Sequence, residues 1–116
     1  MISKSDKIFV AGHRGLVGNA ILNALKKNKY QNILTINRQK LDLTNQHKVF
    51  DFLKKEKPKF IFIAAAKVGG IYSNTKFKAD FVYQNISIQS NIIHGAFLAG
   101  IKDLIFLGTS CVYPQK

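Results

Sequence analysis

Three glycines stand between the first apolar run of the chain and its first amphipathic stretch. Gly12, Gly15 and Gly18 follow "KIFVA" and form the pattern G-x-x-G-x-x-G. Residues 7–12 are predicted to form a strand and 15–29 a helix, because apolar side chains recur in the second segment at helical spacing. A glycine turn at such a junction lets the backbone approach a pyrophosphate, which the amide groups of the helix start then bind. The motif predicts dinucleotide binding, and the alternative is a purely structural glycine turn.

The rest of the chain continues this alternation. Strands are predicted over 32–37, 60–66 and 103–109, and helices over 44–57 and 77–99. The run "FIFIAAA" is apolar throughout, as in a strand buried on both faces of a parallel sheet. The order β-α-β-α-β-α-β therefore predicts an α/β protein with a Rossmann-type doubly wound parallel sheet. With right-handed crossovers, the expected strand order is 3-2-1-4.

Composition narrows the class of protein. A chain of 116 residues has room for one domain, and its apolar fraction of 47% is that of a globular protein. No apolar run reaches the roughly 20 residues that span a membrane, so no membrane partner is expected. The single cysteine, Cys111, excludes an internal disulfide and offers no metal-site spacing, so no metal is expected. The first residues lack the pattern of a signal peptide, and a cytoplasmic location follows as the expectation.

The net charge of +12 raises the question of a nucleic-acid partner. Of the 18 basic residues only two are arginines, Arg14 and Arg38, and the other 16 are lysines scattered along the chain. Proteins that read bases favour arginine for its bidentate geometry. The distribution therefore predicts a lysine-rich solvated surface and no specific nucleic acid, with weak polyanion binding through charge as the alternative.

The two arginines bear on the kind of dinucleotide. NAD-binding folds place an acid about 20 residues after the glycine loop, where it takes the ribose 2′-hydroxyl. Here Asn37 and Arg38 fill that place, and the first acid, Asp42, comes later. Arg14, inside the glycine motif, can reach the same spot, and a guanidinium suits a 2′-phosphate. We therefore expect NADP(H) rather than NAD(H). Asp42 and Leu43 have two interpretations. They contact the adenine, or they form a turn that caps the next helix, and the two interpretations are compatible.

Four stretches of the sequence are shared with one enzyme family. They are "VAGHRGLVG", "AAAKVGGI", "YQNISIQSNIIHGA" and "LGTSCVYP". On these the chain resembles the GDP-L-fucose synthases, NADP-dependent 3,5-epimerase/4-reductases of the extended short-chain dehydrogenase/reductase group. Their substrate is GDP-4-keto-6-deoxy-D-mannose. The resemblance covers essentially the whole chain but only about the first third of a family member. It implies that residues 1–116 are a partial NADP-binding domain, with the substrate domain outside them.

The resemblance also implies roles for particular residues. Thr109 stands at the place of the family's catalytic hydroxyl, commonly a serine, and Cys111 at that of the acid/base thiol for epimerisation. The helix over 77–99 is implied to form a homodimer interface. The implied substrate-binding residues are Lys67, Val68, Gly69 and Gly70. The cofactor-binding residues expected from the motif and the resemblance together are Gly12, His13, Arg14, Gly15, Leu16, Val17, Gly18, Arg38, Asp42, Leu43, Ala64, Ala65, Ala66, Leu107, Gly108, Thr109 and Ser110.

Other functions stay open at the level of sequence. The family's Y-x-x-x-K pair would lie beyond residue 116, so very low turnover is expected of these residues alone. A non-catalytic NADP-binding remnant or interaction module is one alternative, and a fragment of another nucleotide-sugar epimerase or dehydratase is a second. The strand over 103–109 is expected to leave an apolar edge, which favours association of the isolated domain.

Overall fold

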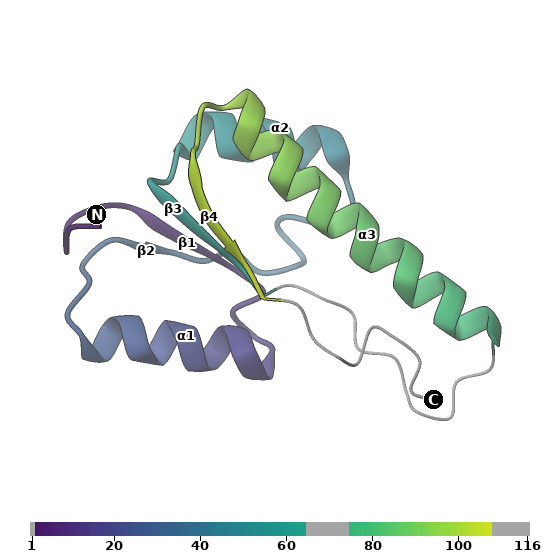
Figure 1. Cartoon of the computed structure of the whole chain (residues 1–116), viewed down its shortest axis with the longest axis horizontal. Helices are drawn as coiled ribbons and strands as arrows, with labels where there is room; N and C mark the ends of the chain where they lie inside the picture. The colour runs from purple at the N-terminus through teal and green to yellow at the C-terminus, as the bar shows by residue number, and fades with distance from the viewer. Residues whose placement is uncertain (1, 65–74, 108–116) are drawn as a thin grey trace.

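The computed structural model describes residues 2–64 and 75–107, and within them the predicted alternation of strands and helices is confirmed (Figure 1). The strands are β1 (Ile8–Ala11), β2 (Ile33–Leu34), β3 (Phe60–Ile63) and β4 (Asp103–Phe106). The helices are α1 (Leu16–Lys27), α2 (Gln46–Glu56) and α3 (Thr75–Leu98). The fold is therefore the expected α/β Rossmann-type arrangement.

The four strands form one parallel sheet in the order β2-β1-β3-β4. β1 pairs with β3 over its whole length, from Ile8 opposite Phe60 to Ala11 opposite Ile63. The expected order 3-2-1-4 is wrong, because the third strand lies beside β1 and not outside β2. β2 has only two paired residues and is half-buried, as suits an edge strand, whereas the wholly apolar β3 needs cover on both of its faces.

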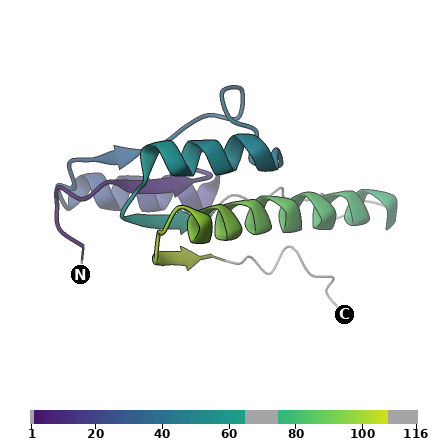
Figure 2. The same cartoon turned by 90° about the horizontal axis from the view of Figure 1, so that it is seen from above.

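The observed order explains where the helices lie. The chain moves from β1 to β2 in one direction and then returns across β1 to β3 and on to β4. Right-handed crossovers in opposite directions place their helices on opposite faces of a sheet. Accordingly α1 lies on one face, and α2 and α3 lie together on the other (Figures 1 and 2). The reversal point, between β1 and β3, is where open α/β sheets bind ligands.

Alternation along the strands divides the core in two. Phe9 and Ala11 of β1 face α2 and α3, whereas Ile8 and Val10 face α1. This follows from the two-residue period of a strand. The larger cluster joins these faces of β1 and β3 to Leu53 of α2 and to the inner side of α3. Its further buried members are Leu41, Val49, Ile61, Ile63, Ile88, Ile92, Ala96, Ala99 and Ile101.

Short-range signals set the helix ends. Asn45 precedes α2, and its side chain accepts a hydrogen bond from the amide of Lys48 (3.1 Å). Gly100 follows α3 with φ +80°, a conformation that suits glycine. The last turns of α1 and α2 carry lysines, Lys26 and Lys27 in α1, which complement the negative end of the helix dipole.

Gly95 lies at a close contact between α3 and α2. A Cβ atom at this position would lie 3.0 Å from side-chain carbons of both Leu53 and Phe50. The missing side chain therefore lets the two helices approach each other. This in turn brings the inner face of α3 against the segment that connects β2 to α2.

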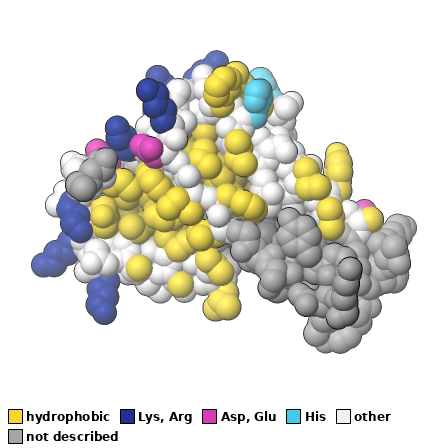
Figure 3. All heavy atoms as spheres, in the orientation of Figure 1, with side chains coloured by type: hydrophobic (Ala, Val, Ile, Leu, Met, Phe, Trp, Pro, Cys, Tyr) yellow, Lys and Arg dark blue, Asp and Glu magenta, His cyan; other side chains and the backbone are white. Residues whose placement is uncertain are grey.

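The β4 side of the sheet is apolar and open. Ile105 and Phe106 keep 44% and 46% of their surface exposed, and Figure 3 shows hydrophobic side chains gathered over this part of the molecule. Within the described residues β4 pairs only with β3, so its outer edge is free, as expected. None of the helices in the part of the chain that the structure describes is long and apolar enough to cross a membrane.

Candidate functional site

The glycine motif folds into a tight turn between β1 and α1. Gly12 has φ +89°, which a residue with a side chain adopts only under strain, and its carbonyl accepts a hydrogen bond from the amide of Gly15 (3.1 Å). Gly18 packs against this turn: a Cβ atom there would lie 1.8 Å from the carbonyl oxygen of Gly12. The close approach of the helix to the turn therefore requires glycine at position 18.

The start of α1 has features that attract an anion. Gly15 is the N-cap residue and supplies no side-chain cap, and the first turn contains no acidic residue. The amide groups of a helix start and its positive dipole end attract phosphate. Leu16 and Val17, both exposed, can contribute only through their backbone, because their side chains do not line the adjoining pocket.

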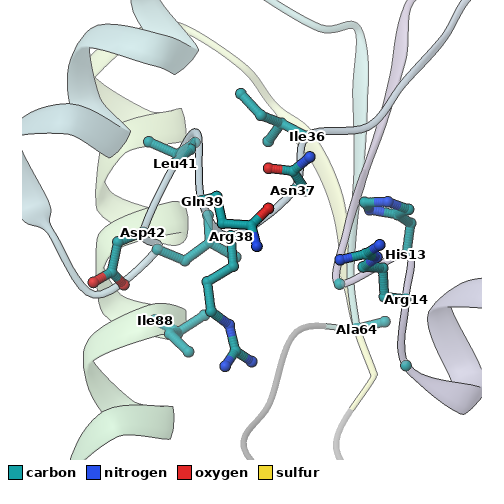
Figure 4. A pocket seen from close by; sticks show the side chains of 13 residues that line it. His13, Arg14, Ile36, Asn37, Arg38, Gln39, Leu41, Asp42, Ala64 and Ile88 are labelled. Atoms are coloured by element: carbon teal, nitrogen blue, oxygen red, sulfur yellow. The ribbon is translucent and has the colours of Figure 1, made fainter.

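This helix start opens on a pocket of about 490 Å³ at the carboxyl ends of β1, β2 and β3 (Figure 4). Three loops and one helix meet there. The loop after β1 contributes four residues, the segment after β2 contributes seven, β3 contributes the residue that follows it, and α3 contributes one. The lining residues are Gly12, His13, Arg14, Gly15, Ile36, Asn37, Arg38, Gln39, Leu41, Asp42, Leu43, Ala64 and Ile88.

The two arginines of the protein lie on opposite sides of this pocket. Arg14 comes from the glycine turn and Arg38 from the segment after β2, and Figure 4 shows both side chains beside the open space between the two elements. Among the described residues neither guanidinium takes part in an ion pair. The pocket thus carries two exposed cations.

His13 stands next to Arg14 on the pocket wall. Burial lowers the pKa of His13 from its usual value of 6.5, and the positive charge of Arg14 lowers it further. The imidazole is therefore neutral at neutral pH while the pocket is empty of anions. An anion in the pocket would reverse part of this effect, because a negative charge favours the protonated ring.

The segment that holds Asp42 and Leu43 is a well-bonded turn. The Asp42 carboxylate accepts hydrogen bonds from the amide (3.0 Å) and the hydroxyl (2.7 Å) of Thr44, immediately before the Asn45 cap. The capping-turn interpretation of Asp42 is therefore confirmed. Because Asp42 and Leu43 also line the pocket, a contact with a bound base stays compatible with it.

The pocket collects many of the predicted cofactor residues and leaves others aside. It brings together Gly12, His13, Arg14, Gly15, Arg38, Asp42, Leu43 and Ala64. Leu107 follows β4, where its amide donates to the carbonyl of Ile63 (3.0 Å), and it is not part of the lining. Leu16, Val17 and Gly18 do not line the pocket either. The other predicted residues lie outside the described residues: Ala65, Ala66, Lys67, Val68, Gly69, Gly70, Gly108, Thr109, Ser110 and Cys111.

Several lining residues were not predicted from the sequence. Ile36, Gln39 and Leu41 flank the predicted Arg38, and extending the prediction along that loop would have found them. Ile88 is different, because it lies on α3, about 50 residues further along the chain, and only tertiary packing brings it to the pocket. Over the described ranges no group of three or more His, Cys, Asp or Glu side chains is placed to hold a metal ion.

Fold and pocket together define a Rossmann-type α/β protein with its ligand pocket at the reversal point of the sheet. A profile of the NAD dependent epimerase/dehydratase family matches residues 8–116. The chain belongs to this family.

Relatives of known name are similar to the chain along nearly all of its length. Putative GDP-L-fucose synthase 2 of Arabidopsis thaliana is 50% identical over 115 residues, which are 99% of this chain and 35% of the relative. GDP-L-fucose synthase of Escherichia coli K12 is 44% identical over 110 residues, 95% of this chain and 34% of the relative. The chain thus spans about a third of the length of the curated relatives it matches.

Solved structures agree with this assignment. A GDP-mannoheptose C4 reductase from Campylobacter jejuni with NADP bound has a TM-score of 0.85 and 40% identity, over 91% of this chain and 33% of that one. A GDP-L-fucose synthetase from Naegleria fowleri bound to NADP has a TM-score of 0.82 and 28% identity, over 100% of this chain and 37% of that one.

Proposed function

We propose that the chain binds NADP(H) in the pocket at the carboxyl ends of β1, β2 and β3. The observation that carries the proposal is the pair of exposed arginines, Arg14 and Arg38, on opposite sides of a pocket that adjoins an uncapped helix start. The helix start suits the pyrophosphate, and the guanidinium groups suit a 2′-phosphate. Two solved relatives carry NADP.

The pocket lining fits the parts of this cofactor. Gly12 and Gly15 leave room for the pyrophosphate because neither residue places a side chain in the pocket. Leu41 and Leu43 offer apolar contacts for an adenine, beside the 2′-phosphate side of the pocket. Ala64 continues β3, where its amide donates to the carbonyl of Ala11 (2.9 Å), and its small side chain on the pocket wall would let a ribose approach closely. Bound NADPH would supply a hydride.

A cofactor titration tests this proposal. Calorimetry on the full-length protein should show NADPH binding with clear preference over NADH. Binding of adenosine 2′,5′-bisphosphate, which carries the 2′-phosphate but no nicotinamide, should also be measurable. Equal affinity for NADPH and NADH, or no binding of either, would overturn it.

For the whole protein we propose the reaction of a GDP-L-fucose synthase. The substrate would be GDP-4-keto-6-deoxy-D-mannose, epimerised at C3 and C5 and reduced by NADPH at C4. Identities of 44% to 50% to proteins of that name support it. The 4-keto group acidifies the protons at C3 and C5, so a thiol and a second acid/base group can exchange them. Cys111 is proposed as that thiol and Thr109 as the hydroxyl that binds the C4 oxygen.

A second candidate is a GDP-sugar C4 reductase without epimerisation. It is favoured by the 40% identity to the Campylobacter GDP-mannoheptose C4 reductase, higher than the 28% to the Naegleria GDP-L-fucose synthetase. Running the reaction of the full-length protein in D₂O separates the two. An epimerase-reductase introduces deuterium at C3 and C5 of the product, whereas a simple reductase introduces none there. A non-catalytic NADP-binding remnant would give no product at all.

We further propose that α3 forms a homodimer interface. Its outer side exposes Ile86, Ile93 and Phe97, at 55%, 43% and 74%. These residues follow one another at intervals of seven and four, so they lie on one side of the helix. A second copy of the chain would cover this stripe, and the oligomeric state in solution tests it. The cytoplasmic location also stays a prediction, which cell fractionation checks.

A further inference from the structure

A buried polar side chain joins α3 to the pocket wall. Asn91 is only 7% exposed to solvent, and its side-chain Nδ2 donates a hydrogen bond to the backbone carbonyl of Leu43 (2.9 Å). The two residues are 48 positions apart in the chain. A buried amide or carbonyl without a partner is strongly unfavourable, so each of these groups holds the other in place.

The segment that receives this bond has no helix or strand of its own. Residues 37–45 pass along the pocket as a series of turns, with several hydrogen bonds between near neighbours. The side chain of Asn37 accepts from the amide of Lys40 (3.1 Å), and Asp42 accepts from Thr44. These local bonds fix the shape of the segment but not its distance from the rest of the pocket. The bond from Asn91 and the buried side chain of Leu41 hold the segment against α3 and the core, together with the packing of Leu43.

The face of α3 that carries Asn91 also lines the pocket. Ile88, one turn before Asn91, lines the pocket directly, and residues three apart share one face of a helix. The inner face of α3 thus supplies part of the pocket surface and also anchors the wall next to it. That wall contains Arg38, Asp42 and Leu43, the residues proposed to meet the adenosine half of the cofactor.

We propose that Asn91 is a positioning residue for the adenosine half of NADP(H), acting through the carbonyl of Leu43. The inference rests on the proposed cofactor site. Without the bond, the segment 37–45 can move away from the glycine turn, and Arg38 moves with it. Affinity for the adenosine half then falls, and so does the preference for a 2′-phosphate.

Substitution of Asn91 in the full-length protein tests the role. Asn91→Asp replaces the donor with an acceptor that faces the Leu43 carbonyl, and Asn91→Ser is a milder change that shortens the side chain. The matched control is Asn28→Asp, which removes an amide bond to the backbone carbonyl of Ala24 (2.7 Å) at the exposed far end of α1. Each variant is titrated with adenosine 2′,5′-bisphosphate, NADPH and NADH well below its melting temperature.

Loss of one such bond should weaken binding of adenosine 2′,5′-bisphosphate by about 5- to 10-fold in both Asn91 variants. The ratio of the NADH and NADPH dissociation constants should fall as well, a change that general destabilisation would not produce. Binding equal to that of Asn28→Asp, or an unchanged NADH to NADPH ratio, overturns the role of Asn91. Failure of the unsubstituted protein to bind adenosine 2′,5′-bisphosphate overturns the proposed cofactor site itself.

Discussion

Gly18 packs so closely on Gly12 that a Cβ atom at position 18 would lie 1.8 Å from the Gly12 carbonyl oxygen and 2.6 Å from its carbonyl carbon. Both are backbone atoms and cannot rotate away. Gly15, three residues earlier, is different, because a Cβ atom there would lie 3.6 Å from the same oxygen, an ordinary contact. The two glycines therefore have separate tasks, one in packing α1 on the turn and one at the pocket.

Alanine at these two positions should give opposite results. Gly18→Ala should lower the free energy of unfolding by about 3 kcal/mol, because the turn and α1 must separate. Gly15→Ala should leave it nearly unchanged but weaken NADPH binding, because its methyl group projects at the pyrophosphate side of the pocket. Urea unfolding and calorimetry on both variants check this. Equal losses of stability would contradict the division of tasks.

Arg38 should determine the choice between NADPH and NADH. Arg38→Leu should weaken NADPH binding by about 10- to 100-fold, the size of a lost charge-assisted hydrogen bond. NADH binding should change little, because NADH has no 2′-phosphate. Lys27→Leu, which makes the same change of charge in the last turn of α1, is the control and should leave both affinities unchanged. A parallel loss of NADH affinity in Arg38→Leu would show that the residue acts on another part of the cofactor.

His13 should make cofactor binding dependent on pH. Its pKa is lowered by burial and then by Arg14, so the free protein carries a neutral imidazole at neutral pH. Phosphates bound nearby would raise this pKa, and binding would take up a proton. NADPH affinity should therefore rise as the pH falls toward the lowered pKa of His13, which lies below 6.5, by up to about tenfold for each unit by which the bound phosphates raise that pKa. In His13→Gln the NADPH affinity should depend less on pH over this range. An unchanged pH dependence would mean that a group other than His13 takes up the proton.

The same group affects stability with the opposite sign. Since the folded-state pKa of His13 lies below the unfolded value near 6.5, the unfolded chain binds the extra proton more readily. The contribution of His13 to stability without cofactor should therefore increase with pH up to about 6.5 and then stay constant. Comparing the urea midpoints of the protein and His13→Gln across this range isolates the contribution, and a decrease with rising pH would contradict it.

Self-association should depend on the outer side of α3. Phe97→Glu places a charge at the C-terminal end of the apolar stripe, on its most exposed member, and sedimentation velocity should then show a monomer where the unsubstituted full-length protein forms a dimer. Leu16→Glu is the matched control, since Leu16 is 92% exposed on α1, away from that stripe. An unchanged oligomer in Phe97→Glu would mean that the copies meet through another surface.

The core offers a check on the fold itself. Leu53 of α2 is fully buried against α3 and the sheet, and its side chain lies beside Gly95. Leu53→Ala should cost about 3 kcal/mol of stability because it leaves a cavity there. Thermal and urea unfolding should show the loss, while NADPH affinity measured well below the melting temperature should be retained.

Local features of this protein could be predicted from its sequence. The glycine motif was predicted to form a tight turn before the first helix, and the structure has that turn between β1 and α1. Arg14 lies within that motif, and Arg38 is located by its distance from it. The cap at Asn45 and the stop at Gly100 depend on backbone groups within a few residues. Such features follow from the sequence because the interacting groups are neighbours in the chain.

Other features were decided only by the tertiary structure. The apolar run that forms β3 shows that the strand is buried but not which strand lies beside it, so the expected order was wrong and β3 pairs with β1. Likewise nothing in the helical pattern of α3 distinguishes Ile88 and Asn91 from other inward residues, yet they line and anchor the pocket. Periodicity reports which side of an element is buried, whereas the partner on that side is selected by how all the elements pack together.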